Sequence, residues 1–532
     1  MARRTPRPHP TTTQTLSPIL RHCPLCGNPM WAADHNYRTI TTLTDVLRLT
    51  LKIRRCITPA CPQFQQPYRP EEEGRLALPK HEFGLDVIAL VGSLRYAHHR
   101  SLPEIHQELR GRRMMIAPRT VQHLLERYDE LGALSLADPL RLQQITQVQG
   151  RVILALDGLQ PDVGHEVLWV LRDCLSAEVL LARSLLSATQ DDLAALIDSV
   201  RQALGVPIVG LISDGQPSIR CAVDKALPNV PHQLCHFHYL RAAAKAVYEA
   251  DRHAKKELKK RVRGVRPIER QLEKRTDPEA EVMRGYCSAV RSALPDDGHP
   301  PLVASWTQAA RPAHRYLPES GARRKKGALP KPLVRLHTLL QRGLTETAPL
   351  WPDVRVAYRW VHRAAHLLTN ADQQPGATVK RRLGGLLGAM MRTRAAAGVL
   401  APARVTFLKV TRSYWPGLLH CYAVPDLPRT NNDLEQCFGA HRYPERRATG
   451  RKGASPALVL RGAVQLIAAA ATRLRGFTAW ELAPAEVRAW QSLRHDLDTR
   501  RHRRTLQRRF RHDPAAYLAE LEAALLKLSL PP

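Results

Sequence analysis

The segment VILALDG at residues 152–158 is a short apolar run that ends in an Asp-Gly pair, and the segment IVGLISDG at residues 208–215 repeats this arrangement. A run of about five apolar residues bounded by turn residues is typical of a strand that is covered on both faces of a sheet. The two segments therefore predict two buried strands, each of which ends at an aspartate.

Further elements surround these two strands. Residues 166–172 and 178–185 predict a hairpin of two strands, and residues 189–204 carry apolar side chains at helical spacing. Residues 232–235 predict one more short strand. This order of strands and helices over residues 150–238 predicts a mixed sheet with helices on its faces, which is an α/β fold.

The two aspartates, Asp157 and Asp214, are the first candidates for chemistry. Functional sites of open sheets form at the carboxyl ends of the strands. Two carboxylates that lie close together repel each other, and a hard cation such as Mg²⁺ relieves that repulsion. Glu435, near the start of a helix that we expect within residues 426–480, is the best candidate for a third ligand. A single Asp-Gly pair at a strand end is often only a turn, so the prediction depends on the combination.

Beyond residue 239 the α/β pattern stops. Residues 239–425 are helical in pattern and strongly basic, and residues 321–331 (GARRKKGALPK) predict an exposed basic loop. Residues 481–532 predict a basic helical tail. Its arginines could contact phosphates, although a charged helix in solvent would show the same pattern.

Four of the ten cysteines gather near the N-terminus as Cys23, Cys26, Cys56 and Cys61. Two short cysteine pairs joined by a β-ribbon can place four thiolates around one structural Zn²⁺. We therefore expect a zinc-ribbon-like domain over residues 21–75. The alternative is four unrelated buried cysteines. Residues 1–20 are basic and rich in Pro and Thr, and we expect a disordered arm there.

Residues 83–140 predict two helices separated by a tight break, which fits a DNA-binding helix-turn-helix. The side chains expected near bases or phosphates are Arg112, Arg113, Arg119, Thr120, Gln122 and His123. An ordinary helical hairpin is the alternative.

The charge of the chain points to a polyanionic partner. Among 532 residues, 80 Lys and Arg stand against 48 Asp and Glu, which gives a net charge of +32 at pH 7. Double-stranded DNA is the first candidate and an anionic membrane surface is the second. No run of about 18 apolar residues predicts a membrane span, and no signal segment is evident, so we expect a cytoplasmic location.

Three motifs in this order resemble the DDE transposases of bacterial insertion sequences. Asp157, Asp214 and Glu435 match the acidic triad. Cys235 and His238 resemble a Cys-x-x-His motif that follows the second Asp, and Asn431 with Asn432 resembles the surroundings of the final Glu. The resemblance covers about residues 20–475. A zinc ribbon followed by a helix-turn-helix also resembles the lineage related to Mutator-like elements.

This resemblance implies an RNase H-like core interrupted by an all-helical insertion domain. It implies two Mg²⁺ or Mn²⁺ ions, with Asp157 bridging them and Asp214 and Glu435 each binding one. The implied reaction is hydrolysis of DNA at the element ends, followed by transfer of the freed 3′-hydroxyl into target DNA. It further implies a homo-oligomer, at least a dimer, on double-stranded DNA in the bacterial nucleoid.

Two other functions fit parts of the sequence. A large, zinc-dependent, sequence-specific DNA-binding regulator would explain the charge and the N-terminal region, but not the three carboxylates. An RNase H-like nuclease that cuts DNA without joining it would explain the carboxylates. The basic helical segment and the N-terminal DNA-binding candidates favour the transposase over that nuclease.

Overall fold

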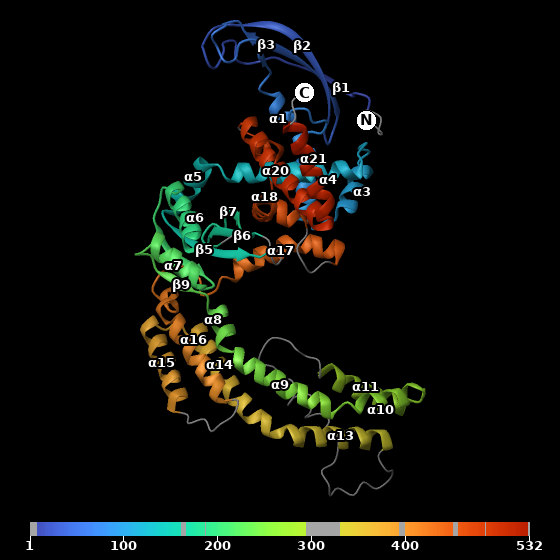
Figure 1. The fold of residues 1–532 in the computed structure, drawn as a ribbon, viewed down its shortest axis with the longest axis vertical. Helices are drawn as coiled ribbons and strands as arrows, with labels where there is room; N and C mark the ends of the chain where they lie inside the picture. Colours follow the sequence, from blue (N-terminus) through green and yellow to red (C-terminus); the bar gives the residue numbers. More distant parts are fainter. Residues whose placement is uncertain are drawn as a thin grey trace. The chain divides into compact units, whose positions relative to one another are not determined.

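The computed structural model describes most of the chain (Figure 1), namely residues 8–160, 166–186, 188–293, 330–392, 400–450, 456–484 and 486–529. Most of the predicted basic loop, residues 321–329, lies outside these ranges. The chain forms two compact units. The first consists of Met1–Val230 and Asn431–Pro532, and the second is Pro231–Thr430. The second unit spans nearly the same residues as the helical segment that we expected.

A small sheet opens the first unit. Its strands and the short helix after it are β1 (Thr12–Leu16), β2 (Met30–Thr41), β3 (Val46–Cys56), β4 (Pro67–Tyr68) and α1 (Glu73–Leu76). The strand order is β1-β3-β2, with β4 also paired to β3. β2 and β3 form the predicted antiparallel ribbon, and β1 runs parallel to β3.

The strand β1 corrects one expectation, because residues 12–16 are not part of a disordered arm. Thr12 pairs with Leu47 and Leu16 pairs with Leu51, so β1 supplies hydrogen bonds to the edge of β3. Leu16 is buried in the small core beneath the sheet. The β-branched threonines of this segment suit an extended chain.

Four helices follow the ribbon: α2 (Leu85–Tyr96), α3 (Leu102–Gly111), α4 (Pro118–Leu136) and α5 (Pro139–Gln149). Ser101 and Glu104 form a capping box at the start of α3. Tyr128 of α4 is fully buried against α2, and a Cβ atom on Gly92 would overlap its ring. Close approach of α2 and α4 therefore requires glycine at this position.

The central sheet contains the predicted strands β5 (Val152–Leu159), β6 (Val167–Asp173), β7 (Val179–Leu185) and β8 (Ile208–Ser213). Its strand order is β7-β6-β5-β8-β9, where β9 is His232–Leu234. β5, β6 and β7 form an antiparallel meander, and β8 runs parallel to β5. The sheet is therefore mixed, as predicted.

Helices cover both faces of this sheet. On one face, α6 (Gln190–Ala203) and α7 (Pro217–Ala226) pack against β5 side chains such as Leu154 and Leu156. On the other face, α17 (Asn432–Thr449) and α18 (Pro456–Leu474) pack against Ala155 and Leu159. Side chains alternate along a strand, so the odd-numbered residues of β5 face α17 and α18.

The second unit is helical. Its elements after β9 are α8 (His236–Ala243), α9 (Lys245–Arg261), α10 (Val265–Glu273), α11 (Pro278–Ala293), α13 (Lys331–Thr347), η1 (Ala348–Leu350), α14 (Trp351–Thr369), α15 (Gly376–Arg392), α16 (Leu400–Tyr414), η2 (Trp415–Gly417) and η3 (His420–Tyr422). Two hydrophobic clusters hold these helices together. One contains Tyr239 and Phe407, and the other contains Leu258 and Ile268.

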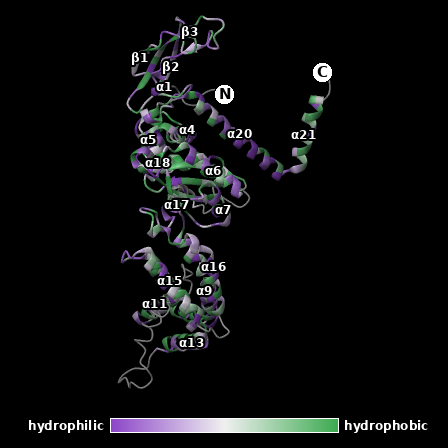
Figure 2. Cartoon of the chain, turned by 90° about the vertical axis from the view of Figure 1, so that its left-hand side faces the viewer, coloured by the Kyte–Doolittle hydropathy of each residue, from purple (hydrophilic) through white to green (hydrophobic). Residues whose placement is uncertain are grey.

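Three helices complete the first unit: α19 (Ala479–Leu482), α20 (Val487–His512) and α21 (Pro514–Ser529). Hydrophilic residues cover most of α20, whereas α21 is mainly hydrophobic (Figure 2). No helix in the described part of the chain is both long enough and apolar enough to cross a membrane.

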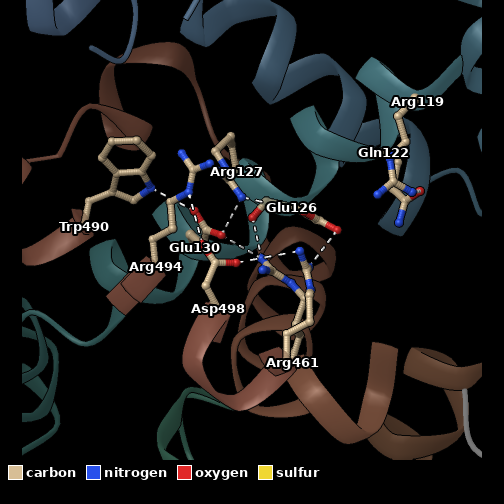
Figure 3. A network of polar contacts seen from close by, with 10 residues as sticks. Arg119, Gln122, Glu126, Arg127, Glu130, Arg461, Trp490, Arg494 and Asp498 are labelled. Carbon is tan, nitrogen blue, oxygen red and sulfur yellow. Dashed lines mark hydrogen bonds and ion pairs between the residues drawn. The ribbon is translucent and has the colours of Figure 1, made fainter. Parts of the chain in front are cut away.

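A buried network of charges joins α4, α18 and α20 (Figure 3). Glu130 of α4 is fully buried and accepts hydrogen bonds from Arg127 at 2.9 Å and from Arg461 of α18 at 3.0 Å. The indole N–H of Trp490, on α20, donates to the same carboxylate at 2.9 Å. Glu130 therefore ties three helices that lie far apart in the sequence.

We expect Glu130→Ala to lower the free energy of unfolding of the first unit by about 3–5 kcal/mol, because two buried guanidinium groups lose their carboxylate. Urea denaturation followed by circular dichroism measures this loss. The control is Glu108→Ala, which breaks the exposed Glu108–Arg112 pair (3.1 Å) and should change stability by less than about 0.5 kcal/mol. A loss below about 1 kcal/mol for Glu130→Ala would show that the network contributes little.

Candidate functional site

Asp157 lies on β5, and Asp214 directly follows the neighbouring parallel strand β8. Asp157 is inside β5, paired with Val170, so the strand continues two residues past the point where the sequence predicted its end. The register pairs Ala155 with Ile212, which stand two residues before Asp157 and two residues before Asp214, and the charge of Asp214 acts on Asp157. Residues level with each other on neighbouring strands point to the same face, about 5 Å apart.

Glu435 comes from α17, which covers that face of the sheet. The amide of Asn431, just before the helix, donates to the backbone carbonyl of Leu156 at 3.3 Å. Leu434 is fully buried in the cluster that also contains Ala155 and Ile212. These two contacts fix the first turn of α17 beside Asp157, and this turn carries Glu435.

The electrostatics of Asp157 reflect the neighbouring carboxylates. Its side chain is buried, and burial together with the charge of Asp214 raises its pKa to about 7. The backbone N–H of Gly158 donates to Asp157 at 2.8 Å and opposes the rise in pKa, whereas the charge of Glu435 adds to it. Asp157 therefore interacts with both of the other predicted acidic residues, which the fold brings together from three separate elements.

Asp214 is also buried, and its carboxylate accepts a hydrogen bond from the backbone N–H of Gln216 at 2.9 Å. Gly215, between them, has a φ of +83°, a value that favours glycine. The tight turn after β8 thus directs Asp214 back towards the end of the sheet. Carboxylate oxygens are the ligand type that Mg²⁺ and Mn²⁺ prefer.

The N-terminal cysteines form a tighter cluster. Among the described residues, Cys23, Cys26, Cys56 and Cys61 are the one group of three or more potential metal ligands whose ligand atoms all lie within 4.8 Å of one another. The Sγ atoms of Cys23 and Cys61 are 3.7 Å apart, and those of Cys26 and Cys56 are 3.6 Å apart. Four sulfurs at 2.3 Å from a tetrahedral Zn²⁺ would be about 3.8 Å apart. This cluster could therefore hold a structural zinc ion.

The turn around the first cysteine pair supports this geometry. The backbone N–H of Gly27 donates to the carbonyl of Cys23 at 2.9 Å, and Gly27 has a φ of +72°. The backbone N–H of Asn28 lowers the pKa of the Cys26 thiol to about 6. The turn therefore favours a thiolate at Cys26, which is the form that binds zinc.

Cys61 shows the opposite effect. The backbone N–H of Gln63 donates to its sulfur at 3.4 Å and favours the thiolate, but burial and the other three cysteines outweigh this and raise the pKa to about 12. Four adjacent sulfurs cannot all ionise unless a cation neutralises them. A bound Zn²⁺ would supply that positive charge.

Cys235 and His238 belong to the second unit. Cys235 is fully buried just before α8, and His238 is half-buried in the first turn of that helix. The neighbouring His236 was not among the residues predicted from the sequence. Its Nε2 atom lies 2.7 Å from the carbonyl of Leu418, and burial lowers its pKa to about 4. His236 is therefore neutral and structural, a role that appears only when the distant Leu418 packs beside it.

The six predicted DNA contacts lie around the turn between α3 and α4. Arg112, Arg113, Arg119 and His123 are exposed, and Thr120 and Gln122 are half-buried. Arg112 forms an ion pair with Glu108, and Arg119 donates to the side chain of Gln122 at 3.1 Å. These side chains come from the start of α4 or from the turn before it. Figure 3 shows Arg119 and Gln122 apart from the buried network on the same helix.

Comparison with protein-family models and with curated proteins gave no match for this chain.

Proposed function

We propose that this protein is a DDE-type DNA transposase with Asp157, Asp214 and Glu435 as its catalytic metal ligands. One observation carries the proposal. Three acidic residues come from β5, from the end of β8 and from the first turn of α17 to one face of a mixed sheet, where burial and the charges of Asp214 and Glu435 raise the pKa of Asp157 to about 7. Structural carboxylates are seldom placed so that they repel one another in a buried site.

The sheet supports an RNase H-like core for the transposase. An antiparallel meander of β5, β6 and β7 is followed by β8, which lies parallel to β5 on the opposite side from β6. The second unit interrupts this core between Asp214 and Glu435, where the resemblance to transposases implies a helical insertion. The net charge of +32 supports a nucleic-acid substrate.

Residues of this chain would supply the metal ligands that the proposed reaction requires. Asp157 and Asp214 lie close enough for the charge of Asp214 to act on Asp157, and Asn431 positions the helix that carries Glu435. Mg²⁺ or Mn²⁺ bound there would activate the attacking water or 3′-hydroxyl and stabilise the leaving oxygen at phosphorus. Below pH 7 Asp157 is protonated in the metal-free protein, so metal binding should weaken there.

The proposed DNA contacts are those of α3 and α4 as a helix-turn-helix. Arg119, Thr120 and Gln122 lie in the first turns of α4, where recognition helices contact base edges. Exposed Arg112 and Arg113 in the preceding turn would contact phosphates. The buried network around Glu130 holds α4 firmly, which favours a defined orientation on DNA.

A strand-cleavage and strand-transfer assay tests the proposal. Labelled duplex DNA carrying the ends that flank the gene is incubated with Mg²⁺, with Mn²⁺ or without a divalent cation. Wild type is compared with Glu435→Gln. The matched control is Asp433→Asn, which removes an exposed carboxylate from the same helical turn.

We expect metal-dependent nicking and joined products from wild type and from Asp433→Asn. Glu435→Gln should lose more than about 100-fold of both activities, because even residues that only support metal ligands contribute 10–100-fold. Cleavage without joining would instead indicate a nuclease. Binding without cleavage in any metal would indicate a DNA-binding regulator and would reject the transposase.

A further inference from the structure

The sheet formed by β1, β3 and β2 has one covered face and one open face. Along β3, the side chains of Leu49, Leu51 and Ile53 are buried and pack against α1. The residues between them alternate to the other face. On that face Arg48 and Lys52 are exposed and Thr50 is half-buried. The sheet therefore packs its core on one side only.

The strand register identifies the other residues of this open face. Across β3, Arg48 lies opposite Thr39, Thr50 lies opposite Tyr37, and Lys52 lies opposite His35. On the other side, β1 places Thr13 beside Arg48 and Thr15 beside Thr50. We call this set the ribbon face; it consists of Thr13, Thr15, His35, Tyr37, Thr39, Arg48, Thr50 and Lys52.

The ribbon face contains cations and hydroxyl groups but no acidic residue. Asp34, at the irregularity in β2, forms an ion pair with Arg55. Asp45 lies in the turn between β2 and β3, where it receives a hydrogen bond from Thr44. The tyrosine in the centre of the face, Tyr37, is 61% exposed. Lysine and arginine with hydroxyl donors form the side-chain set that contacts DNA phosphates.

A cavity of about 210 Å³ connects the ribbon face with the predicted DNA-binding helices. Tyr37 and Thr39 line it from the ribbon face, Lys80 lines it from the loop after α1, and Met115 lines it from the turn between α3 and α4. Glu82 also lines this cavity. DNA held at the turn between α3 and α4 would thus lie next to the ribbon face.

We propose that the ribbon face binds the sugar–phosphate backbone of duplex DNA next to the segment held by α3 and α4. Arg48 and Lys52, four residues apart on β3, span about 13 Å and would contact successive parts of one backbone. Proteins that bind single-stranded DNA stack successive bases on several aromatic rings. The ribbon face exposes one tyrosine and one histidine, so it suits the backbone of duplex DNA better than a single strand. This inference rests on the proposed function, because it assumes that the substrate is duplex DNA.

The test measures binding of the full-length, zinc-loaded protein to duplex DNA by fluorescence anisotropy without added Mg²⁺. The variant Arg48→Thr with Lys52→Thr keeps side chains that suit a strand. The control, Arg201→Gln with Lys225→Gln, removes the same number of positive charges from exposed positions on α6 and α7. Zinc content and circular dichroism verify that each variant is folded.

For the ribbon-face variant, the slope of log K against log salt should become shallower by about 2, since each phosphate contact contributes about 0.9. The loss should be equal for element-end DNA and for unrelated duplexes, because phosphate contacts carry no sequence information. An unchanged slope, or the same change in the control, would overturn the inference. The inference would also be overturned if the ribbon-face variant bound single-stranded DNA more weakly but bound duplex DNA as wild type does.

A second measurement needs no variant. Duplex DNA should protect Lys52 of the wild type from chemical acetylation, read by mass spectrometry, and should leave Lys225 reactive; equal reactivity of Lys52 with and without DNA would contradict the inference. Both experiments record binding in the absence of cleavage. If the protein binds DNA in this way but never cuts it, the proposal of a transposase is rejected, whereas the inference that the ribbon face binds DNA still holds.

Discussion

Asp157→Asn should abolish metal-dependent DNA cleavage and, at the same time, stabilise the metal-free protein at pH 8 by as much as about 4 kcal/mol. The pKa of Asp157 in the folded protein is about 7, well above that of an aspartate in an unfolded chain. At pH 8 the folded wild type therefore carries a buried charge that burial and Asp214 oppose. Asparagine has the same shape and no charge, so it removes that cost.

The pH dependence of this gain has a definite sign. Between about pH 4 and pH 7 the folded wild type binds more protons at Asp157 than the unfolded chain does, so its stability falls as the pH rises through this window. The gain from Asp157→Asn should therefore be small near pH 4 and complete above pH 7. Thermal or urea unfolding of metal-free protein at a series of pH values measures it.

Magnesium should narrow this difference in stability, and it should reverse the order only above about 1,000-fold Kd, where binding adds about 4.1 kcal/mol. A cation that binds only the folded wild type adds about 1.4 kcal/mol when its concentration is about tenfold above Kd, and more at higher concentrations. The variant should not respond to Mg²⁺. Asp198→Asn, at the exposed Asp198–Arg201 pair, is the control and should behave as wild type. If Asp157→Asn responds to Mg²⁺ as strongly as wild type does, Asp157 is not a metal ligand.

Loss of the cysteine cluster should have the second large effect. We expect Cys56→Ser to release zinc and to unfold the sheet of β1, β2 and β3, because binding of a structural zinc supplies about 10–16 kcal/mol of folding free energy in small domains. Cys56 is the last residue of β3 and pairs with Met30 at the start of β2, so it connects the metal cluster directly to the ribbon.

Zinc content after dialysis and limited proteolysis of residues 12–68 measure this outcome. Cys221→Ser is the matched control, because Cys221 is exposed on α7 and lies outside the cluster. The control should retain zinc and resist proteolysis. The cysteine cluster would be no zinc site if wild type purified without zinc and its ribbon resisted protease in the presence of chelator.

Local sequence patterns were sufficient to predict many of the elements. The helical spacing of apolar side chains over residues 189–204 predicted α6, because this spacing depends only on residues three and four positions apart. The apolar runs before Asp157 and Asp214 predicted β5 and β8. The spacing of the four cysteines was sufficient to predict a cluster, since two short pairs joined by a ribbon have few ways to fold.

Other features depend on contacts between distant parts of the chain. The sequence of residues 12–16 is as compatible with a disordered arm as with a strand, and pairing with β3 makes it β1. Glu130 is an ordinary helical glutamate until Arg461 and Trp490 reach it from residues more than 300 positions away. His236 becomes a buried structural residue only beside Leu418.

The candidate site also depends partly on local sequence and partly on contacts between distant parts of the chain. The sequence by itself predicted which three carboxylates act together, because the apolar runs before Asp157 and Asp214 and the motif around Glu435 are visible in it directly. The tertiary structure decided their surroundings: the parallel pairing of β5 and β8 brings the charge of Asp214 to Asp157, and the amide of Asn431 donates to the carbonyl of Leu156 and so brings α17 to them. Burial and mutual repulsion arise only when these three elements pack together, so the raised pKa of Asp157 is a property of the fold and not of the sequence motif.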